Sequence, residues 1–507
     1  MTSQIDNEIN LDHLKMDLAF HSDKSIPFGV LKLGIPPVGQ VGAAGNLGAA
    51  GNLGAVGKTI PTQHIVLFNI DISGSMDDRC ADGRTKMEHA IHTTKNIWKM
   101  LTEKTNIIAS LNAFDDQVDE IISPEFITNE NMILSLQKIN NLLPRNSTNI
   151  ELALVKINSQ IYDMLDKYPD ASITHILLTD GNATAGCRDP LILSTLVNTK
   201  IMNVFIGYGI DHSAQMLSTL GNCLNANYYF IDQIEKGGLV LGEIYNSIFN
   251  KRYSNVIIQG IGLEFYNFRN NTWSPTLQID FLISETERTF HVRFHPEKQE
   301  FILENGTLLT ISGLDILTNI NGTLSMFNTK NAKHTDLQKY IFRQRTQEFM
   351  FRAQNENDNL SIKEDLKALL TEIKNYMETH LLLEDTFYVS LCDDLAITIR
   401  TYGTEHGFMY AAGRINSNGN ERAYNICSIP PSNTHRQQVG HFRSVGISQH
   451  VRAMRGNSVA AGAGNTLDAN DDSQEEDIGH TITQTNINST NVTPSMSRAM
   501  RNASLPW

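Results

Sequence analysis

Cysteine is scarce in this chain of 507 residues, which contains five. They are odd in number, far apart and never spaced as Cys-x-x-Cys: Cys80, Cys187, Cys223, Cys392 and Cys427. Zinc cages and disulfide frameworks need paired or clustered cysteines, so the sequence argues against both. Reduced thiols in a cytoplasmic protein are the expectation that follows.

Long apolar runs and an excess of positive charge are also absent. No uncharged apolar segment reaches about 18 residues, so no membrane span is expected. Residues 1–24 carry scattered acids and no apolar core, unlike a secretory signal. With 41 basic and 55 acidic residues, the formal net charge of −14 argues against a general nucleic-acid binder.

The first half of the chain contains a linker-like segment and then a regular alternation. Residues 1–60 include a Gly/Ala-rich stretch with the repeating unit Asn-Leu-Gly-Ala-Ala-Gly, which predicts a flexible linker. From 61 to 250, near-continuous apolar runs alternate with helical patterns such as 85–104 and 149–167. This alternation predicts an α/β domain, with a doubly wound, mostly parallel sheet covered on both faces.

The second half changes character three times. Residues 251–332 alternate with period two and contain turn signals, which predicts an antiparallel, β-sandwich-like domain. Residues 333–430 begin with two helical patterns, expected to pair as a hairpin, and continue with strand-like runs near 385–402. Residues 431–507 are rich in Asn, Ser, Thr and Gly and predict a mostly disordered tail.

One basic stretch lies near the start of that tail. Between Arg422 and Leu467 there are five arginines and no acid. The stretch could bind the acidic cluster of the chain's own tail, an acidic partner or RNA. A solvated linker is the interpretation we favour.

Three motifs place oxygen-bearing side chains where predicted elements meet. In "FNIDISGSMDD", an apolar strand ends in Asp71, and Ser73 and Ser75 follow. In "PRNSTNIEL", Thr148 precedes a helix and fits a capping box with Glu151. In "HILLTDG", another apolar strand ends in Asp180. Ligands bind at the carboxyl ends of the strands in such sheets, and carboxylates with hydroxyls suit a hard cation.

The order of these motifs resembles the metal-ion-dependent adhesion site of von Willebrand factor A domains. The five positions of that site are matched by Asp71, Ser73, Ser75, Thr148 and Asp180. The surrounding sequence matches too: "STN" stands before a predicted helix, "LLTDG" ends a predicted strand, and "VFIGYG" forms the next predicted strand. The resemblance covers residues 62–250.

The resemblance implies a protein-binding site whose partner supplies an Asp or Glu to a bound ion. We expect Ser73 and Ser75 to be direct ligands, and Asp71 and Asp180 to act directly or through water. Thr148 would act directly or through water, depending on conformation. Mg²⁺ is the expected ion, with Mn²⁺ and Ca²⁺ as alternatives. Two carboxylates would roughly neutralise a divalent ion, which could then attract one more acid.

Other interpretations of the same residues remain open. Each has a local role available in a cap or turn, so an α/β domain with no metal is the plain alternative. A phosphatase-type nucleophile at Asp71 is disfavoured, because that chemistry usually places a second acid where Ser73 stands. The loops beside the site offer Asp77, Asp78 and Asn182 as partner-binding candidates.

The C-terminal part carries a weaker resemblance. The order of domains followed by "EHGFMYAAGRINSNGNERAYN" is similar to intracellular von Willebrand A proteins with a companion region. Some plant members of that group add a RING domain, whose Cys and His ligands are absent here. We therefore expect a non-enzymatic interaction module of undetermined oligomeric state. The alternatives are a substrate-recruiting subunit of a ubiquitin-ligase-like complex, and a structural component of a large, even viral, assembly with a vestigial metal site.

Overall fold

The computed structural model describes most of the chain between residues 14 and 421. The described ranges are 14–23, 25–36, 63–80, 83–209, 212–231, 234–295, 308–326, 329–356, 360–404 and 407–421, together with residues 11 and 499. The Gly/Ala-rich repeat, the basic stretch and the predicted disordered tail, apart from residue 499, lie outside the described residues. Ala499 is buried against the core of the α/β unit.

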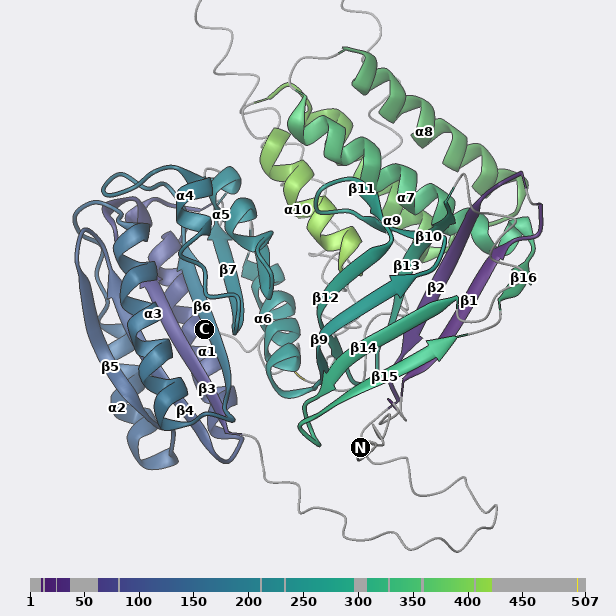
Figure 1. The fold of residues 1–507 in the computed structure, drawn as a ribbon. Helices are drawn as coiled ribbons and strands as arrows, with labels where there is room; N and C mark the ends of the chain where they lie inside the picture. Colours follow the sequence, from purple (N-terminus) through teal and green to yellow (C-terminus); the bar gives the residue numbers. More distant parts are fainter. Residues whose placement is uncertain are drawn as a thin grey trace, which may run out of the picture.

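Residues 63–249 form the predicted α/β unit (Figure 1). Its sheet has the order β5-β4-β3-β6-β7-β8, and every neighbouring pair is parallel except β4 and β5. The strands are β3 (His64–Asp71), β4 (Ile107–Phe114), β5 (Val118–Phe126), β6 (Ser172–Thr179), β7 (Met202–Tyr208) and β8 (Ala226–Ile231). The prediction of a doubly wound, mostly parallel sheet is confirmed.

Helices cover both faces of this sheet because its central strands are apolar on both sides. Val66, Phe68 and Ile70 pack toward one set of helices, whereas Ile65 and Leu67 pack toward the other. The first set is α1 (Lys86–Thr102), α2 (Asn129–Asn140) and α6 (Ile234–Phe249). The second set is α3 (Ile150–Lys167), α4 (Pro190–Ser194) and α5 (Ala214–Gly221). Successive side chains of a strand point to opposite faces, so this double burial follows from the unbroken apolar run.

A two-sheet β-sandwich follows the α/β unit. One sheet has the order β11-β10-β13-β2-β1-β16 and the other β12-β9-β14-β15. From the middle of the chain come β9 (Lys251–Gly260), β10 (Leu263–Asn267), β11 (Thr272–Ser274), β12 (Thr276–Ile283), β13 (Glu287–Phe294), β14 (Leu309–Asp315), β15 (Ile320–Met326) and β16 (Lys330–Ala332). Side chains of both sheets form one apolar core, as a sandwich requires.

The first strands of the chain belong to this sandwich, which the sequence did not predict. β1 (Lys15–His21) and β2 (Phe28–Gly34) pair with each other, and β2 also pairs along its length with β13. Leu18, Phe20, Leu31 and Leu33 lie in the sandwich core. The described residues 15–34 are therefore part of the sandwich, and the α/β unit is inserted after β2.

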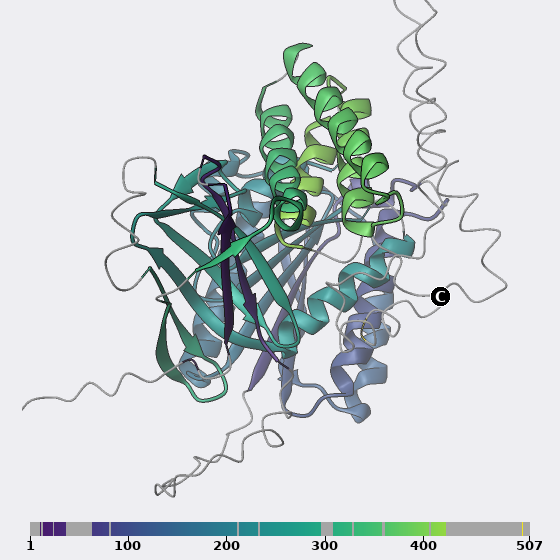
Figure 2. The same ribbon diagram turned by 90° about the vertical axis from the view of Figure 1, so that its right-hand side faces the viewer.

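Four helices gather at one end of the sandwich (Figure 2). They are α7 (His334–Asn355), α8 (Leu360–Thr379), α9 (Thr386–Thr401) and α10 (Gly407–Gly419). The first two occupy the predicted helical stretches. The strand-like runs expected near 385–402 are wrong, because this segment is helix α9. Its apolar side chains recur at helical spacing and pack against α8, and Asp385 caps its start by accepting from the Phe387 N–H at 2.9 Å.

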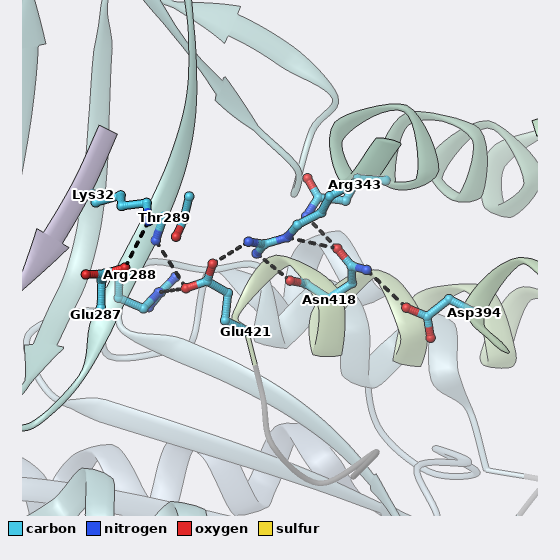
Figure 3. Close-up of polar contacts among 9 residues, drawn as sticks. Lys32, Glu287, Arg288, Thr289, Arg343, Asp394, Asn418 and Glu421 are labelled. Atoms are coloured by element: carbon cyan, nitrogen blue, oxygen red, sulfur yellow. Dashed lines mark hydrogen bonds and ion pairs between the residues drawn. The ribbon is translucent and has the colours of Figure 1, made fainter. Parts of the chain in front are cut away.

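A polar network at the end of α10 connects these helices to the sandwich (Figure 3). The Glu421 carboxylate accepts from the Thr289 N–H at 3.1 Å and pairs with Arg343 of α7. Arg343 also donates to the Asn418 carbonyl oxygen at 2.7 Å, and Asn418 donates to Asp394 of α9 at 3.0 Å. Residues from a strand and three helical segments thus share one network.

Contacts of the same kind connect the sandwich to the α/β unit. Arg269 donates to the Ala226 carbonyl oxygen at 3.2 Å and to Asp280 at 2.9 Å, and Asp280 accepts from the Asn225 N–H at 2.9 Å. Within the described residues, no helix combines the length and apolarity that crossing a bilayer requires.

Candidate functional site

The candidate site lies where β3 and β6 end side by side. These strands are parallel neighbours with Ile70 opposite Leu178, so Asp71 comes to lie beside the end of β6. The Thr179 hydroxyl donates to one Asp71 carboxylate oxygen, and the Ser73 N–H donates to the other at 2.8 Å. The register of the sheet therefore brings the first and third motifs together.

Asp71 and Asp180 are both fully buried at this edge. Burial raises the pKa of Asp71 to about 7, and the neighbouring Asp180 carboxylate adds to the rise. Hydrogen bonds from Ser73 and Thr179 act in the opposite direction. Two buried carboxylates at one edge form a site that a cation would stabilise.

The hydroxyl groups come from the two neighbouring loops. Ser73 and Ser75 flank the start of the short helix η1 (Gly74–Asp77), and their Oγ atoms lie 3.2 Å apart. Thr148 is 1% exposed, and its N–H donates to the Thr184 hydroxyl at 2.8 Å. The Arg145 N–H donates to the Ile72 carbonyl oxygen, which joins the Thr148 loop to the end of β3.

The predicted capping box of Thr148 and Glu151 is wrong. Asn149 caps helix α3 by accepting from the Leu152 N–H at 3.0 Å. Glu151 instead accepts from the Cys187 N–H at 2.8 Å, in the loop after Asp180. The helix start therefore does not need the Thr148 hydroxyl.

The surroundings of Asp180 fit a cation. Its Oδ2 atom lies 3.2 Å from the Lys86 ammonium. Its Oδ1 atom is buried and has no hydrogen-bond partner among the described residues. A buried carboxylate oxygen without a donor is costly, and coordination of an ion would satisfy it.

The donor set indicates which class of ion the site could hold. Nowhere in the described ranges do three or more His, Cys, Asp or Glu side chains group as a metal centre. The residues at this edge would supply two carboxylates and three hydroxyls. Such ligands suit Mg²⁺, Mn²⁺ or Ca²⁺ rather than zinc or copper.

Two charged residues at this edge were missed by the sequence reasoning. Lys86, the first residue of α1, is 2% exposed and pairs with Asp180. Asp115, just after β4, receives hydrogen bonds from Arg145 at 2.7 Å and Asn146 at 3.0 Å. Burial acts to raise the pKa of Asp115, but hydrogen bonds from Gln117, Asn146 and Arg145 outweigh it and lower the pKa. Asp115 follows a third strand end, which was the signal that could have revealed it.

The three loop candidates lie on the surface around the site. Asp77, Asp78 and Asn182 are exposed, and Asp78 Oδ2 lies 3.6 Å from the Lys86 ammonium. Their role in binding a partner stays a prediction.

A separate cavity of about 140 Å³ lies between the α/β unit, the sandwich and α7. Arg288, His291 and Arg343 are among its lining residues, and none of the predicted site residues is. The strand-end site is therefore distinct from this cavity.

Comparison with solved structures finds similar chains. The von Willebrand factor type A protein from Catenulispora acidiphila superposes with a TM-score of 0.50 at 14% identity, covering 82% of this chain and 98% of that chain. The ArnB paralog VWA2 from Sulfolobus acidocaldarius gives a TM-score of 0.43 at 13% identity, covering 80% and 99%. No family model matches the sequence, and no curated protein is similar to it in sequence.

The likeness to the Catenulispora protein defines the fold class. The α/β unit makes up less than half of the chain, whereas the superposition covers 82%, so the match includes much of the sandwich and helices as well. The chain therefore has a von Willebrand factor A fold within a larger arrangement that another protein shares. At 14% identity this likeness shows the fold and not the metal site.

Proposed function

We propose that this protein is a non-catalytic interaction module that binds an acidic side chain of a partner protein through a divalent metal ion. The observation that carries the proposal is the unpartnered, buried Asp180 Oδ1 atom at the end of β6, beside the buried Asp71 and near the loops that carry Ser73, Ser75 and Thr148. Most buried polar side-chain atoms have a partner, so an unpartnered buried carboxylate oxygen calls for an explanation, and a bound cation would supply one.

The residues present would divide the work of holding the ion. Ser73, Ser75 and Thr148 offer neutral hydroxyl oxygens, and Asp71 and Asp180 offer negative charge. Mg²⁺ prefers six oxygen ligands and keeps several waters, so an open position would accept a carboxylate of the partner. The bound ion would supply a positive charge that attracts this carboxylate. The exposed Asp77, Asp78 and Asn182 surround the site and would discriminate between partners.

Calorimetric titration of the full chain with Mg²⁺ or Mn²⁺ tests the metal-binding step. We expect saturable one-to-one binding that Asp180→Ala abolishes. Asp170→Ala is the matched control, because Asp170 is an exposed acid before the opposite, amino end of β6. Equal binding by the wild type and Asp180→Ala, or no binding at millimolar metal with or without an acidic ligand, would contradict the proposal.

The partner step needs a second measurement. Immobilised peptides with one central Glu or Gln should be compared in Mg²⁺ and in chelator. Retention of the protein by the Glu peptide in Mg²⁺ alone would support the proposal. Equal retention by both peptides would remove the acidic partner from it.

A further inference from the structure

Lys86 places a positive charge inside the proposed metal site. Its ammonium lies 3.2 Å from Asp180 Oδ2, and the residue is 2% exposed. The start of α1 fixes this position, because the Thr85 hydroxyl caps the helix and the Lys86 N–H donates to the Asp78 carbonyl oxygen at 3.0 Å. The Lys86 side chain is thus buried and its backbone is fixed by the start of α1, unlike a surface lysine that reaches the site from solvent.

The charges at this edge do not balance once a divalent ion is added. With both carboxylates ionised, as coordination of a cation requires, Asp71 and Asp180 contribute two negative charges and Lys86 one positive charge, so these three groups sum to −1 before metal is added. A divalent ion would change this to +1. Asp115 does not correct the balance, because Arg145 pairs with it at 2.7 Å. Asp78 is 3.6 Å from Lys86, but its side chain is 63% exposed and its charge is screened by water.

We infer that Lys86 is a resident cation that makes metal binding depend on the acidic ligand. Without metal, the ammonium stabilises the Asp180 carboxylate and the fold. With metal alone, the ammonium and the ion repel each other in a buried setting, where charge interactions are strong. A carboxylate ligand neutralises the surplus charge, so metal and ligand bind cooperatively. This inference rests on the proposed function and names its regulation.

Binding of Mn²⁺ to the full chain, followed by electron paramagnetic resonance of the free ion, tests the inference. Acetate serves as the carboxylate probe, and chloride at equal ionic strength is the reference. For the wild type, we expect acetate to tighten Mn²⁺ binding. For Lys86→Met, which keeps the length of the side chain and removes its charge, we expect at least tenfold tighter binding in chloride and a smaller effect of acetate.

Two control variants separate charge from structure. Lys86→Arg keeps the charge and should behave as the wild type, and Lys99→Met removes an exposed lysine from the same helix. Thermal unfolding in chelator checks the fold of each variant. Lys86→Met should melt at a lower temperature than the wild type in chelator and show a larger rise when Mn²⁺ is added.

The outcomes distinguish this inference from the proposed function. If Lys86→Met binds Mn²⁺ no more tightly than the wild type, or if acetate acts equally on both, the resident-cation inference is overturned while metal binding stands. If the wild type never binds Mn²⁺ but Lys86→Met does, the inference is supported and the proposed function fails. If neither binds, both are overturned.

Discussion

Asp71 illustrates how burying a single charged residue can act against the stability of the fold. It is fully buried, its pKa is raised to about 7 by burial and by Asp180, and Lys86 pairs with Asp180 rather than with Asp71. A carboxyl group whose pKa is raised in the folded state lowers stability as the pH increases from about 4 to 7. Metal-free protein near neutral pH therefore bears a cost for keeping this side chain ionised.

The first prediction follows from that cost. In chelator at pH 8, Asp71→Asn should raise the free energy of unfolding by about 1–2 kcal/mol, because it removes a buried negative charge. This is a common size for a single stabilising substitution. The same variant should lose the stabilisation that Mg²⁺ gives the wild type. Urea unfolding with and without Mg²⁺ measures both effects, with Asp170→Asn as the surface control. A variant less stable than the wild type in chelator would show that Asp71 is chiefly structural.

His175 gives a second prediction at the residue scale. Burial in the sheet lowers its pKa to about 4, although a 3.2 Å contact with Asn203 Oδ1 acts to raise it. A histidine with a lowered folded pKa contributes stability that is present above its unfolded pKa and is lost as the pH falls toward the folded value. The window is therefore pH 6.5 down to about 4, and the loss from His175 alone is about 3 kcal/mol.

Urea unfolding at pH 6.5 and pH 5 measures this window. The wild type should lose about 2 kcal/mol between the two pH values from His175, because each unit of pKa shift is worth about 1.4 kcal/mol. His175→Gln should be less stable at pH 6.5 but should lose less between them. Part of the slope should remain, since burial also lowers the pKa values of His64 and His291. An unchanged slope in His175→Gln would contradict the assignment.

Of the three acidic residues at or just after the strand ends of this edge, Asp71 and Asp180 were singled out from the sequence and Asp115 was missed. Asp71 and Asp180 lie at the ends of neighbouring parallel strands, as the alternating pattern predicted, while their role as metal ligands stays a prediction. Lys86 was missed because nothing in the sequence around it indicates that the side chain of this first helical residue is buried against Asp180. The cap at Thr148 was misassigned, since Thr148 and Asn149 are both good caps and only the loop geometry selects between them.

At the scale of elements, helices and strands with a clear local periodicity were predicted from the sequence, whereas pairing between distant strands was not. The helices α7 and α8 and the strands of the α/β unit follow periodicity that a short window contains. The segment of α9 is rich in β-branched and aromatic residues, whose intrinsic propensity favours strands. In the folded chain it is a helix, because its apolar side chains pack against α8. β2 pairs with β13, and no local signal joins segments so far apart in the chain.

The polar network at the end of α10 gives an element-scale prediction. The Glu421 carboxylate accepts from the Thr289 N–H and pairs with the Arg343 guanidinium. The side chains of Glu421 and Arg343 are both buried, at most 8% exposed. Removing one partner of a buried pair leaves the other charge uncompensated, so Glu421→Gln should cost about 3–5 kcal/mol. Glu372→Gln removes an exposed pair with Arg345 and should cost less than about 1 kcal/mol.

Chemical denaturation of the two variants distinguishes these values. The contrast between Glu421→Gln and Glu372→Gln is the informative quantity, because each removes one carboxylate charge from a pair with an arginine of α7. Similar costs for both would show that the α10 network does not hold the helices on the sandwich.

At the scale of the whole molecule, the α/β unit that carries the candidate site and the sandwich have separate apolar cores. The five proposed ligands lie on the α/β unit, whose cores draw on its own strands and helices almost throughout. The sandwich core includes strands from both ends of that insertion. We therefore expect damage to the sandwich core to leave the proposed metal site intact as long as the chain stays folded.

Leu31→Ala tests this separation. Leu31 lies in β2 with none of its surface exposed, so truncation should lower the free energy of unfolding by about 2–5 kcal/mol. Mg²⁺ affinity of the folded variant should stay within about twofold of the wild type, because the contacts that orient Asp71 and Asp180 come from the α/β unit. Lys15→Ala, at an exposed position of β1, is the surface control. A loss of Mg²⁺ affinity in Leu31→Ala that exceeds its unfolded fraction would show that the sandwich and the metal site are energetically coupled, with the Arg269 and Asp280 contacts as the structural route between them.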